Sequence, residues 1–351
     1  VATTALEAGY DKVLAAITQM VGRTLVSVRD YRGKFLDMEL SAMEWGSIIR
    51  KLKIADVDWQ DSAEFDLVDG ESIDQWKVKK ANVLQLNFYG QNVFELQSPS
   101  ILMDQLDAAF SGPSELSRFI AGIGTTMANQ RRQKDETVRR MLVSNFIAGK
   151  IDADNGVIHL LTEYNDETGE SLTAQTVYAP DNFKNFIYWL YARLNTLAGL
   201  MSERSQLFQI NVTGKEINQF TDPENLRVKM YAPFMNAIDA RVRANTFDNN
   251  YLKMASTEAV NFWQSIETPN AINCTPTYLG TDGEIITGQA VEASNIIGIM
   301  YDRDAMGIVT QNERVMQTPF NARGHYSNIF WSYNQKWYSD FTEKAIVLVL
   351  D

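Results

Sequence analysis

The chain has 351 residues, 45% hydrophobic and 22% charged, a composition typical of a globular protein with one large or two to three interwoven domains. Its net charge of -12 argues against simple non-specific nucleic-acid binding, because that mode needs Lys and Arg to displace counterions from phosphates. One cysteine, Cys274, and two histidines exclude an internal disulfide and a zinc site made from the usual nitrogen and sulfur ligands.

The first third of the chain changes from a helical to a strand pattern. Residues 4–22 carry apolar side chains at helical spacing and predict an amphipathic arm, and residues 24–28 are strand-like. From Lys34 the period becomes two in KFLDMEL, which predicts a strand. Residues 83–88 and 93–96, with a turn at 89–92, predict a β-hairpin.

Between the strand expected from Lys34 and the hairpin expected at 83–96 lies a stretch, residues 54–76, that contains many acids and not one Lys or Arg. Basic segments flank it at 50–53 and 77–80, so we expect an extended loop with a charged tip. The acids are Asp56, Asp58, Asp61, Glu64, Asp66, Asp69, Glu71 and Asp74. A calcium site and a glycosidase-type carboxylate pair are alternatives, but the spacing matches no calcium loop and clustered loop acids are usually solvated.

Residues 113–149 predict one long helix that begins at Pro113 and stops at Gly149, with a length of roughly 55 Å at 1.5 Å per residue. Its two ends are amphipathic, whereas its middle, 128–140, has almost no apolar face. We expect this middle to be covered by another copy of the chain. The alternatives are a solvated face and a nucleic-acid contact, which Asp135 and Glu136 would interrupt. The bases concerned are Arg131, Arg132, Lys134, Arg139 and Arg140.

The remainder of the chain predicts a helical unit followed by strands. Short strands at 157–163 and 173–178 are expected to form a hairpin, and helices are expected at 181–201, 237–244 and 257–266. Strands follow at 296–301, 307–309, 326–338 and 345–350. The last of these, AIVLVL, is apolar throughout, so we expect it to be buried on both faces beside strands laid down much earlier.

No motif of catalysis or cofactor binding stands out. Cys274 lies in a turn-like stretch that nothing links to His159 or His325, so a packing role is favoured over nucleophilic catalysis. Gly122 and Gly124 lie inside the long helix and not before one, which argues against a phosphate loop. We therefore expect no catalytic residue, no metal and no cofactor.

The order of these elements resembles the major capsid protein fold of tailed bacteriophages, the Hong Kong ninety-seven (HK-97) type, and especially its podophage, phi-twenty-nine-like branch. The closing stretch 322–350, ARGHYSNIFWSYNQKWYSDFTEKAIVLVL, is similar to the aromatic strand and small apolar strand that end proteins of this family. The resemblance implies an α+β fold with five parts. These are an N-arm at 1–29, an E-loop at 30–98, a first peripheral part at 99–179 with a spine helix at 112–150, an axial domain at 180–294, and a peripheral return at 295–351.

The resemblance also implies a structural function without catalysis. Copies would form the hexamers and pentamers of an icosahedral shell around packaged double-stranded DNA, which is enclosed without sequence-specific binding. The implied partners are further copies, a scaffolding protein and a portal protein, and no membrane. The implied location is the virion, with assembly in the cytoplasm of the bacterial host.

Two other functions remain open at this point. An encapsulin-type compartment shares the fold and would enclose enzyme cargo, whereas a carbohydrate-active enzyme would need the acids to line a cleft. Some family members crosslink a loop Lys to a neighbour's Asn. Lys34, Lys51, Lys53 and the lysines within 77–80 lie in the corresponding region, but no partner pattern matches and we predict no crosslink.

Charge complementarity suggests a specific contact between copies. We expect the acids of the loop, Asp58, Asp61, Glu64, Asp66, Asp69 and Glu71, to lie across the bases of the long helix in a neighbour. On this hypothesis Asp66→Lys with Asp69→Lys blocks shell formation, and Arg131→Glu with Arg132→Glu partly restores it.

Overall fold

The computed structural model describes most of the chain from residue 29 onward. The described residues are 29–41, 48–57, 83–97, 101–102, 113–210, 217–241, 257–279, 284–319, 321–324 and 326–351, with Asp69, Trp76, Val78 and Lys80 as single residues. The expected helix at 4–22, the expected strand at 24–28 and most of the acidic stretch lie outside them.

The chain divides into two compact units. The first unit comprises residues 1–34, 92–137 and 310–335, and the second comprises residues 35–91, 138–309 and 336–351. The chain leaves and re-enters each unit, so neither is a continuous stretch of sequence.

A five-stranded mixed sheet forms the centre of the second unit, in the order β5-β16-β12-β6-β7. β16 pairs antiparallel with β12 and parallel with β5, and β6 pairs antiparallel with β12 and parallel with β7. Every residue of β12 and β16 is buried, as expected for AIVLVL. The strands are β5 (Val157–His159), β6 (Leu226–Tyr231), β7 (Thr257–Val260), β12 (Ile296–Asp302) and β16 (Ala345–Val349).

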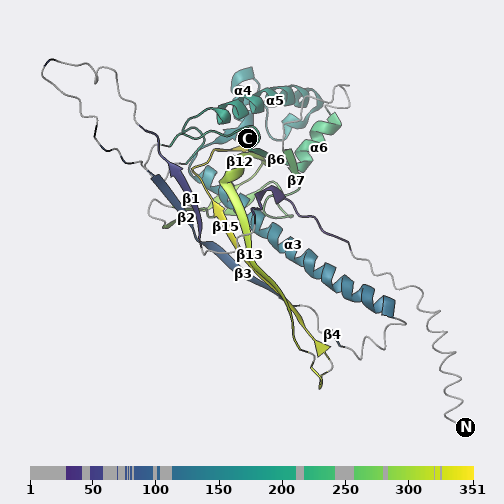
Figure 1. The fold of residues 1–351 in the computed structure, drawn as a ribbon. Helices are drawn as coiled ribbons and strands as arrows, with labels where there is room; N and C mark the ends of the chain where they lie inside the picture. Colours follow the sequence, from purple (N-terminus) through teal and green to yellow (C-terminus); the bar gives the residue numbers. More distant parts are fainter. Residues whose placement is uncertain are drawn as a thin grey trace, which may run out of the picture. The chain divides into compact units, whose positions relative to one another are not determined.

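Three helices cover one face of this sheet (Figure 1). They are α4 (Leu160–Thr168), α5 (Pro180–Ser202) and α6 (Ala232–Arg241), with a short 3-10 turn, η3 (Thr176–Tyr178), before α5. In the core, Leu190 and Leu197 of α5 pack in one cluster with Val228 and Met230 of β6 and Leu348 of β16. This contact holds the helical layer on the sheet through apolar burial.

The opposite face of the sheet carries charge. Lys229 lies between Val228 and Met230, so it points away from the helical layer. Its Nζ atom is 2.6 Å from an oxygen of Asp37 and 2.7 Å from one of Glu258. Asp37 lies in the 3-10 turn η1 (Leu36–Met38), which this buried lysine anchors to the sheet.

The described residues of the second unit also form three two-stranded sheets. β1 (Ile49–Ile54) and β2 (Val83–Phe88) form an antiparallel pair that we name the ribbon. β8 (Ile272–Cys274) pairs with β11 (Val291–Ala293), and β9 (Thr277–Leu279) pairs with β10 (Ile285–Thr287). A 3-10 turn, η5 (Arg303–Ala305), follows β12.

The long helix α3 (Pro113–Asp152) has 40 residues, which confirms the expected start at Pro113 and extends the expected end by one turn. Its residues up to 137 belong to the first unit, together with most of a three-stranded sheet in the order β13-β15-β3. The strands are β3 (Gly90–Gln97), β13 (Met306–Gln317) and β15 (Ile329–Ser339). A short antiparallel pair, β4 (Ile101–Leu102) with β14 (Tyr326–Ser327), belongs to the same unit.

Several predicted elements differ from the structure. KFLDMEL contains η1 and no strand, because Phe35 adopts a left-handed conformation (φ 60°) at its start. The strand expected through Glu163 ends at His159 and continues as α4, because Leu160, Leu161 and Tyr164 bury one helical face and Gly169 ends the helix at φ 75°. Residues 257–260 form β7 and not a helix, because they pair with β6 at the sheet edge.

The hairpin predicted at 83–96 is also wrong, although both of its strands exist. β2 pairs with β1, and β3 pairs in the sheet with β15. The pairing of strands depends on which distant partner offers a hydrogen-bonding edge, and local sequence does not contain that information. The central sheet contains β5, β12 and β16 from the ranges expected as peripheral, and β6 and β7 from the range expected as axial. The domain borders themselves remain a proposal.

Candidate assembly site on the long helix

The basic middle of α3 is the surface that the sequence singled out, and its first base packs within the first unit. The guanidinium of Arg131 lies 5.1 Å from the ring centroid of Trp331 and 4.8 Å from that of Tyr333. It also forms an ion pair with Glu313 and lies 3.7 Å from Asp135. Cation–π and ionic contacts therefore replace an apolar seam between helix and sheet here.

The next two bases are more exposed. The side chain of Arg132 is 46% exposed and lies 3.4 Å from a carboxylate oxygen of Asp30, which is itself 74% exposed. Arg132 also donates a 3.2 Å hydrogen bond to the carbonyl oxygen of Tyr31. Lys134 is exposed, with its Nζ atom 5.1 Å from the ring centroid of Phe94. Contacts of this exposed kind contribute little to stability.

The last two bases are buried in the second unit. Arg139 is 3% exposed and pairs with Glu39. Arg140 donates to the carbonyl oxygen of Phe262, and its guanidinium lies 3.6 Å from the Phe262 ring centroid. The chain therefore covers part of the helix middle itself, and cover of the exposed part by another copy stays a prediction. The sequence reading missed this because the covering groups are aromatic and acidic residues far away in sequence.

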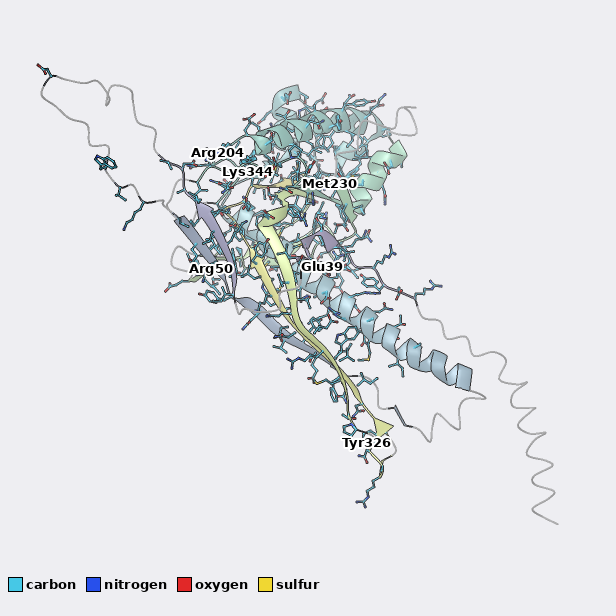
Figure 2. All side chains as sticks on the ribbon, viewed as in Figure 1. Glu39, Arg50, Arg204, Met230, Tyr326 and Lys344 are labelled. Carbon is cyan, nitrogen blue, oxygen red and sulfur yellow. The ribbon has the colours of Figure 1, made fainter. Side chains whose placement is uncertain are left out.

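The acidic residues of the predicted contact are described only in part. Asp69 is exposed, and Asp58, Asp61, Glu64, Asp66 and Glu71 lie outside the described residues. Asp56, at the start of the acidic stretch, forms an ion pair with Arg204 and accepts a hydrogen bond from the amide of Asn218 (Arg204 is labelled in Figure 2). The stem of the stretch is thus fixed to the second unit.

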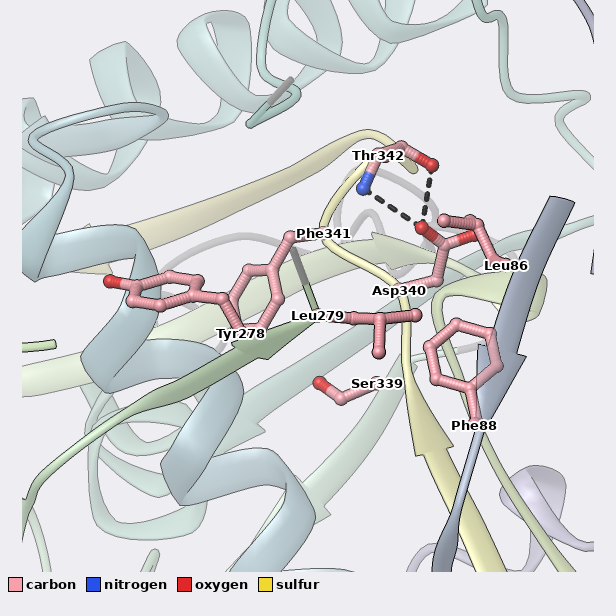
Figure 3. Close-up of a pocket in the computed structure, with 8 residues that line it drawn as sticks. All are labelled: Leu86, Phe88, Tyr278, Leu279, Ser339, Asp340, Phe341 and Thr342. Carbon is pink, nitrogen blue, oxygen red and sulfur yellow. Dashed lines mark hydrogen bonds between the residues drawn. The ribbon is translucent and has the colours of Figure 1, made fainter. Parts of the chain in front are cut away.

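A second charged cluster fixes the ribbon, and the sequence analysis missed it. The Nζ atoms of Lys51 and Lys53 lie 2.8 and 3.3 Å from the same oxygen of Asp340, and 2.5 and 2.8 Å from Glu343. The other Asp340 oxygen accepts hydrogen bonds from the backbone N–H and the hydroxyl of Thr342 (Figure 3). We name the four charged residues of this cluster, Lys51, Lys53, Asp340 and Glu343, the lysine clamp. Two positive and two negative charges balance within it.

Electrostatics in the lysine clamp favour the charged forms. Burial favours a protonated Asp340, but the ammonium groups of Lys51 and Lys53 outweigh it and lower the pKa of this carboxyl below its usual value. Burial likewise opposes a charged Lys51, yet Asp340 and Glu343 raise the pKa of its ammonium group. The clamp is therefore a charged structure at neutral pH, and it orients strand β1.

Among the described residues, no group of three His, Cys, Asp or Glu side chains is placed to hold a metal ion. None of the helices in the described part of the chain combines the length and the hydropathy that a membrane span requires. The clusters found are ion pairs and cation–π contacts that hold distant segments together.

Solved structures of phage proteins have a similar fold. The capsid structure of Staphylococcus phage Andhra matches with a TM-score of 0.63 and 9% identity, over 94% of this chain and 87% of that chain. A chain in the structure of the head fiber and inner core protein gp22 of native bacteriophage P68 matches with a TM-score of 0.63 and 9% identity, over 94% and 88%. The capsid structure of the cyanophage P-SCSP1u matches with a TM-score of 0.52 and 14% identity, over 94% and 91%.

These likenesses establish the α+β fold of the Hong Kong ninety-seven type, and sequence comparison establishes the family. No curated protein sequence matches the chain. The family model of the Phi29-like phage major capsid proteins matches residues 1–349. Because this match spans nearly the whole length, the chain belongs to the Phi29-like phage major capsid proteins, which are structural proteins of the capsid shell and not enzymes.

Proposed function

We propose that copies of this chain form the hexamers and pentamers of an icosahedral shell that encloses packaged double-stranded DNA. The observation that carries the proposal is the family match over residues 1–349. A net charge of -12 supports the part that concerns DNA, because an acidic protein holds DNA without binding it tightly. As a phage capsid protein the chain is part of the virion.

The assembly pathway is the second part of the proposal. The shell would form in the cytoplasm of the bacterial host, with a separate scaffolding protein and a portal protein as partners. Closed shells of one protein need the same subunit in slightly different surroundings, and a scaffold is one means to select the correct curvature.

The third part is the contact between the acidic stretch of one copy and the basic middle of α3 in the next. Arg132 and Lys134 favour this contact most, because their side chains are exposed. Arg131, Arg139 and Arg140 already contact partners in their own chain. For Arg139 and Arg140, exchange of those partners would first expose a buried charge. The opposite charges would set register and association rate more than affinity.

The first experiment tests assembly. The full chain is expressed, fractionated by size in moderate salt and imaged by negative-stain electron microscopy. We expect closed shells, tubes, or rings of five and six subunits. A uniformly monomeric or dimeric species, even with scaffold or a crowding agent added, would contradict the proposal.

The second experiment tests the charge contact. Asp66→Lys with Asp69→Lys should abolish shells, and Arg132→Glu with Lys134→Glu in the same chain should restore them in part. Arg131 is left intact because its charge also holds helix and sheet together within the first unit. The matched control is Asp166→Lys with Glu170→Lys, the same change of charge at exposed positions on and after α4. Normal assembly of the first double variant would rule the contact out.

A further inference from the structure

Strand β1 presents an unusual face to solvent. Its alternating sequence, Lys51-Leu52-Lys53-Ile54, would place either the lysines or the apolar residues inward. The structure buries Lys53 and half-buries Lys51, and it leaves Leu52 60% and Ile54 69% exposed. Arg50, which Figure 2 labels, is also exposed and by strand alternation shares the face of Leu52 and Ile54.

The lysine clamp is the cause of this orientation. In the ribbon, Lys51 is opposite Leu86 and Lys53 is opposite Leu84, and both leucines are buried. A shift of one residue would bring Leu52 and Ile54 inward and release both lysines. Asp340 and Glu343 prevent that shift, because their buried carboxylates would lose both of their ammonium partners. The outward position of Leu52 and Ile54 is therefore a fixed feature of the second unit.

The second unit also has a matching hollow. A groove of about 380 Å³ lies beside α3, β9 and the end of β15. Its lining, all of it among the described residues, contains no Asp, Glu, Lys or Arg. Among its large apolar lining residues, Tyr89, Met141 and Ile285 are 51%, 47% and 67% exposed. The chain's one cysteine, Cys274, lines the groove and is half-buried.

We propose that this groove receives Leu52 and Ile54, on the outward face of β1, from a second copy of the chain, with Arg50 of that copy left outside the groove. The groove has no charge with which to pair a charged occupant, so desolvation disfavours a charged segment and favours an apolar one. The two surfaces belong to different elements, so the contact is heterologous. A heterologous contact between identical subunits forms a ring when the rotation that it imposes closes, as in a pentamer or hexamer. The inference rests on the proposed assembly into rings and shells.

Cys274 gives a direct test. Ile54→Cys places a thiol on the outward face of β1, and the native Cys274 supplies the second. Under mild oxidation with copper phenanthroline, assembled shells of this variant should yield a ladder of covalent oligomers on a non-reducing gel. A disulfide needs Cα atoms within about 7 Å, so a ladder requires real contact between the two surfaces.

Two controls make the ladder specific. Ile54→Cys with Cys274→Ser should give no ladder, because one thiol of each pair is missing. Tyr188→Cys places a thiol at a position on α5 that is 50% exposed, and it should not link to Cys274. Shells of Ile54→Cys without a ladder, or with only an internal disulfide in single chains, would overturn the proposal. An equal ladder from Tyr188→Cys would do the same.

A second measurement uses the unaltered protein. A maleimide probe should label Cys274 in unassembled chains and lose that labelling in shells. Equal labelling in both states would overturn the proposal. Because this measurement uses the wild-type chain, it tests the proposal even if the Ile54→Cys variant does not assemble. Failure of the wild-type chain to form shells under any condition would instead count against the proposed function, so the two failures are distinguishable.

Discussion

The Nζ atom of Lys53 lies 2.8 Å from a carboxylate oxygen of Glu343, and both side chains are buried. This pair joins strand β1 to the turn between β15 and β16, near the end of the chain. With Lys51 and Asp340 it forms a balanced cluster that fixes which face of β1 points outward. An internal ion pair thus determines a surface property of the subunit.

Removal of one acid from the lysine clamp should destabilise the folded protein. We expect Glu343→Ala to lower the free energy of unfolding by about 3 kcal/mol, because it leaves buried ammonium groups without one of their partners. Urea denaturation of the unassembled protein measures this change. The control Glu170→Ala removes an exposed carboxylate and should change the value by less than about 0.5 kcal/mol. Equal effects of the two variants would show that the clamp is not stabilising.

Acid should weaken the same cluster. The lysines lower the pKa of Asp340 below its ordinary value of 3.8, so the folded state binds a proton later than the unfolded state does as pH falls. The resulting stability is present above about pH 4 and is lost as pH falls further, through the lowered pKa. The stability difference between wild type and Asp340→Asn should therefore shrink below about pH 4. Urea denaturation at several pH values tests this, and a constant difference down to pH 2 would contradict it.

Lys150 should also make the stability depend on pH, here through burial of its amine and not through ion pairs. Its side chain is fully buried and donates a 2.7 Å hydrogen bond to the carbonyl oxygen of Phe208. Burial lowers the pKa of this amine from 10.5 to about 7. Between these values the unfolded state binds more protons than the folded state, so stability should rise with pH. The stability of wild type relative to Lys150→Met should increase from about pH 7 to pH 10, and a flat difference would contradict the assignment.

The end of α3 approaches its surroundings closely at Gly149. An added Cβ there would overlap the ring of Phe341, which stacks on Phe146 at a centroid distance of 4.6 Å. We expect Gly149→Ala to destabilise the protein by about 1–3 kcal/mol through overpacking. Gly124→Ala is the matched control in the same helix, where an added Cβ meets nothing within 4 Å. It should stabilise by up to about 1 kcal/mol, because alanine favours a helix over glycine. Thermal or urea unfolding compares the two.

Some predicted elements depend on neighbouring residues, and others depend on partners far away in sequence. Helices α3 and α5 and strand β16 follow from patterns contained in neighbouring residues, such as Pro113 at a helix start and the apolar run AIVLVL. The hairpin expected at 83–96 was wrong because β2 and β3 take partners far away in sequence. The helix expected at 257–266 was wrong for the same reason, since β6 provides an edge for β7.

The sequence by itself determined the acidic balance, the long helix, the buried terminal strand and, with them, the family. Only the tertiary structure decided that Arg139 and Arg140 are buried in their own chain, that the lysines of β1 point inward, and that Cys274 lines an uncharged groove. The physical reason is that periodicity fixes which residues share a face. Which face becomes buried depends on the free energy of contacts with distant residues, and here two carboxylates near the end of the chain outweigh the burial of two aliphatic side chains.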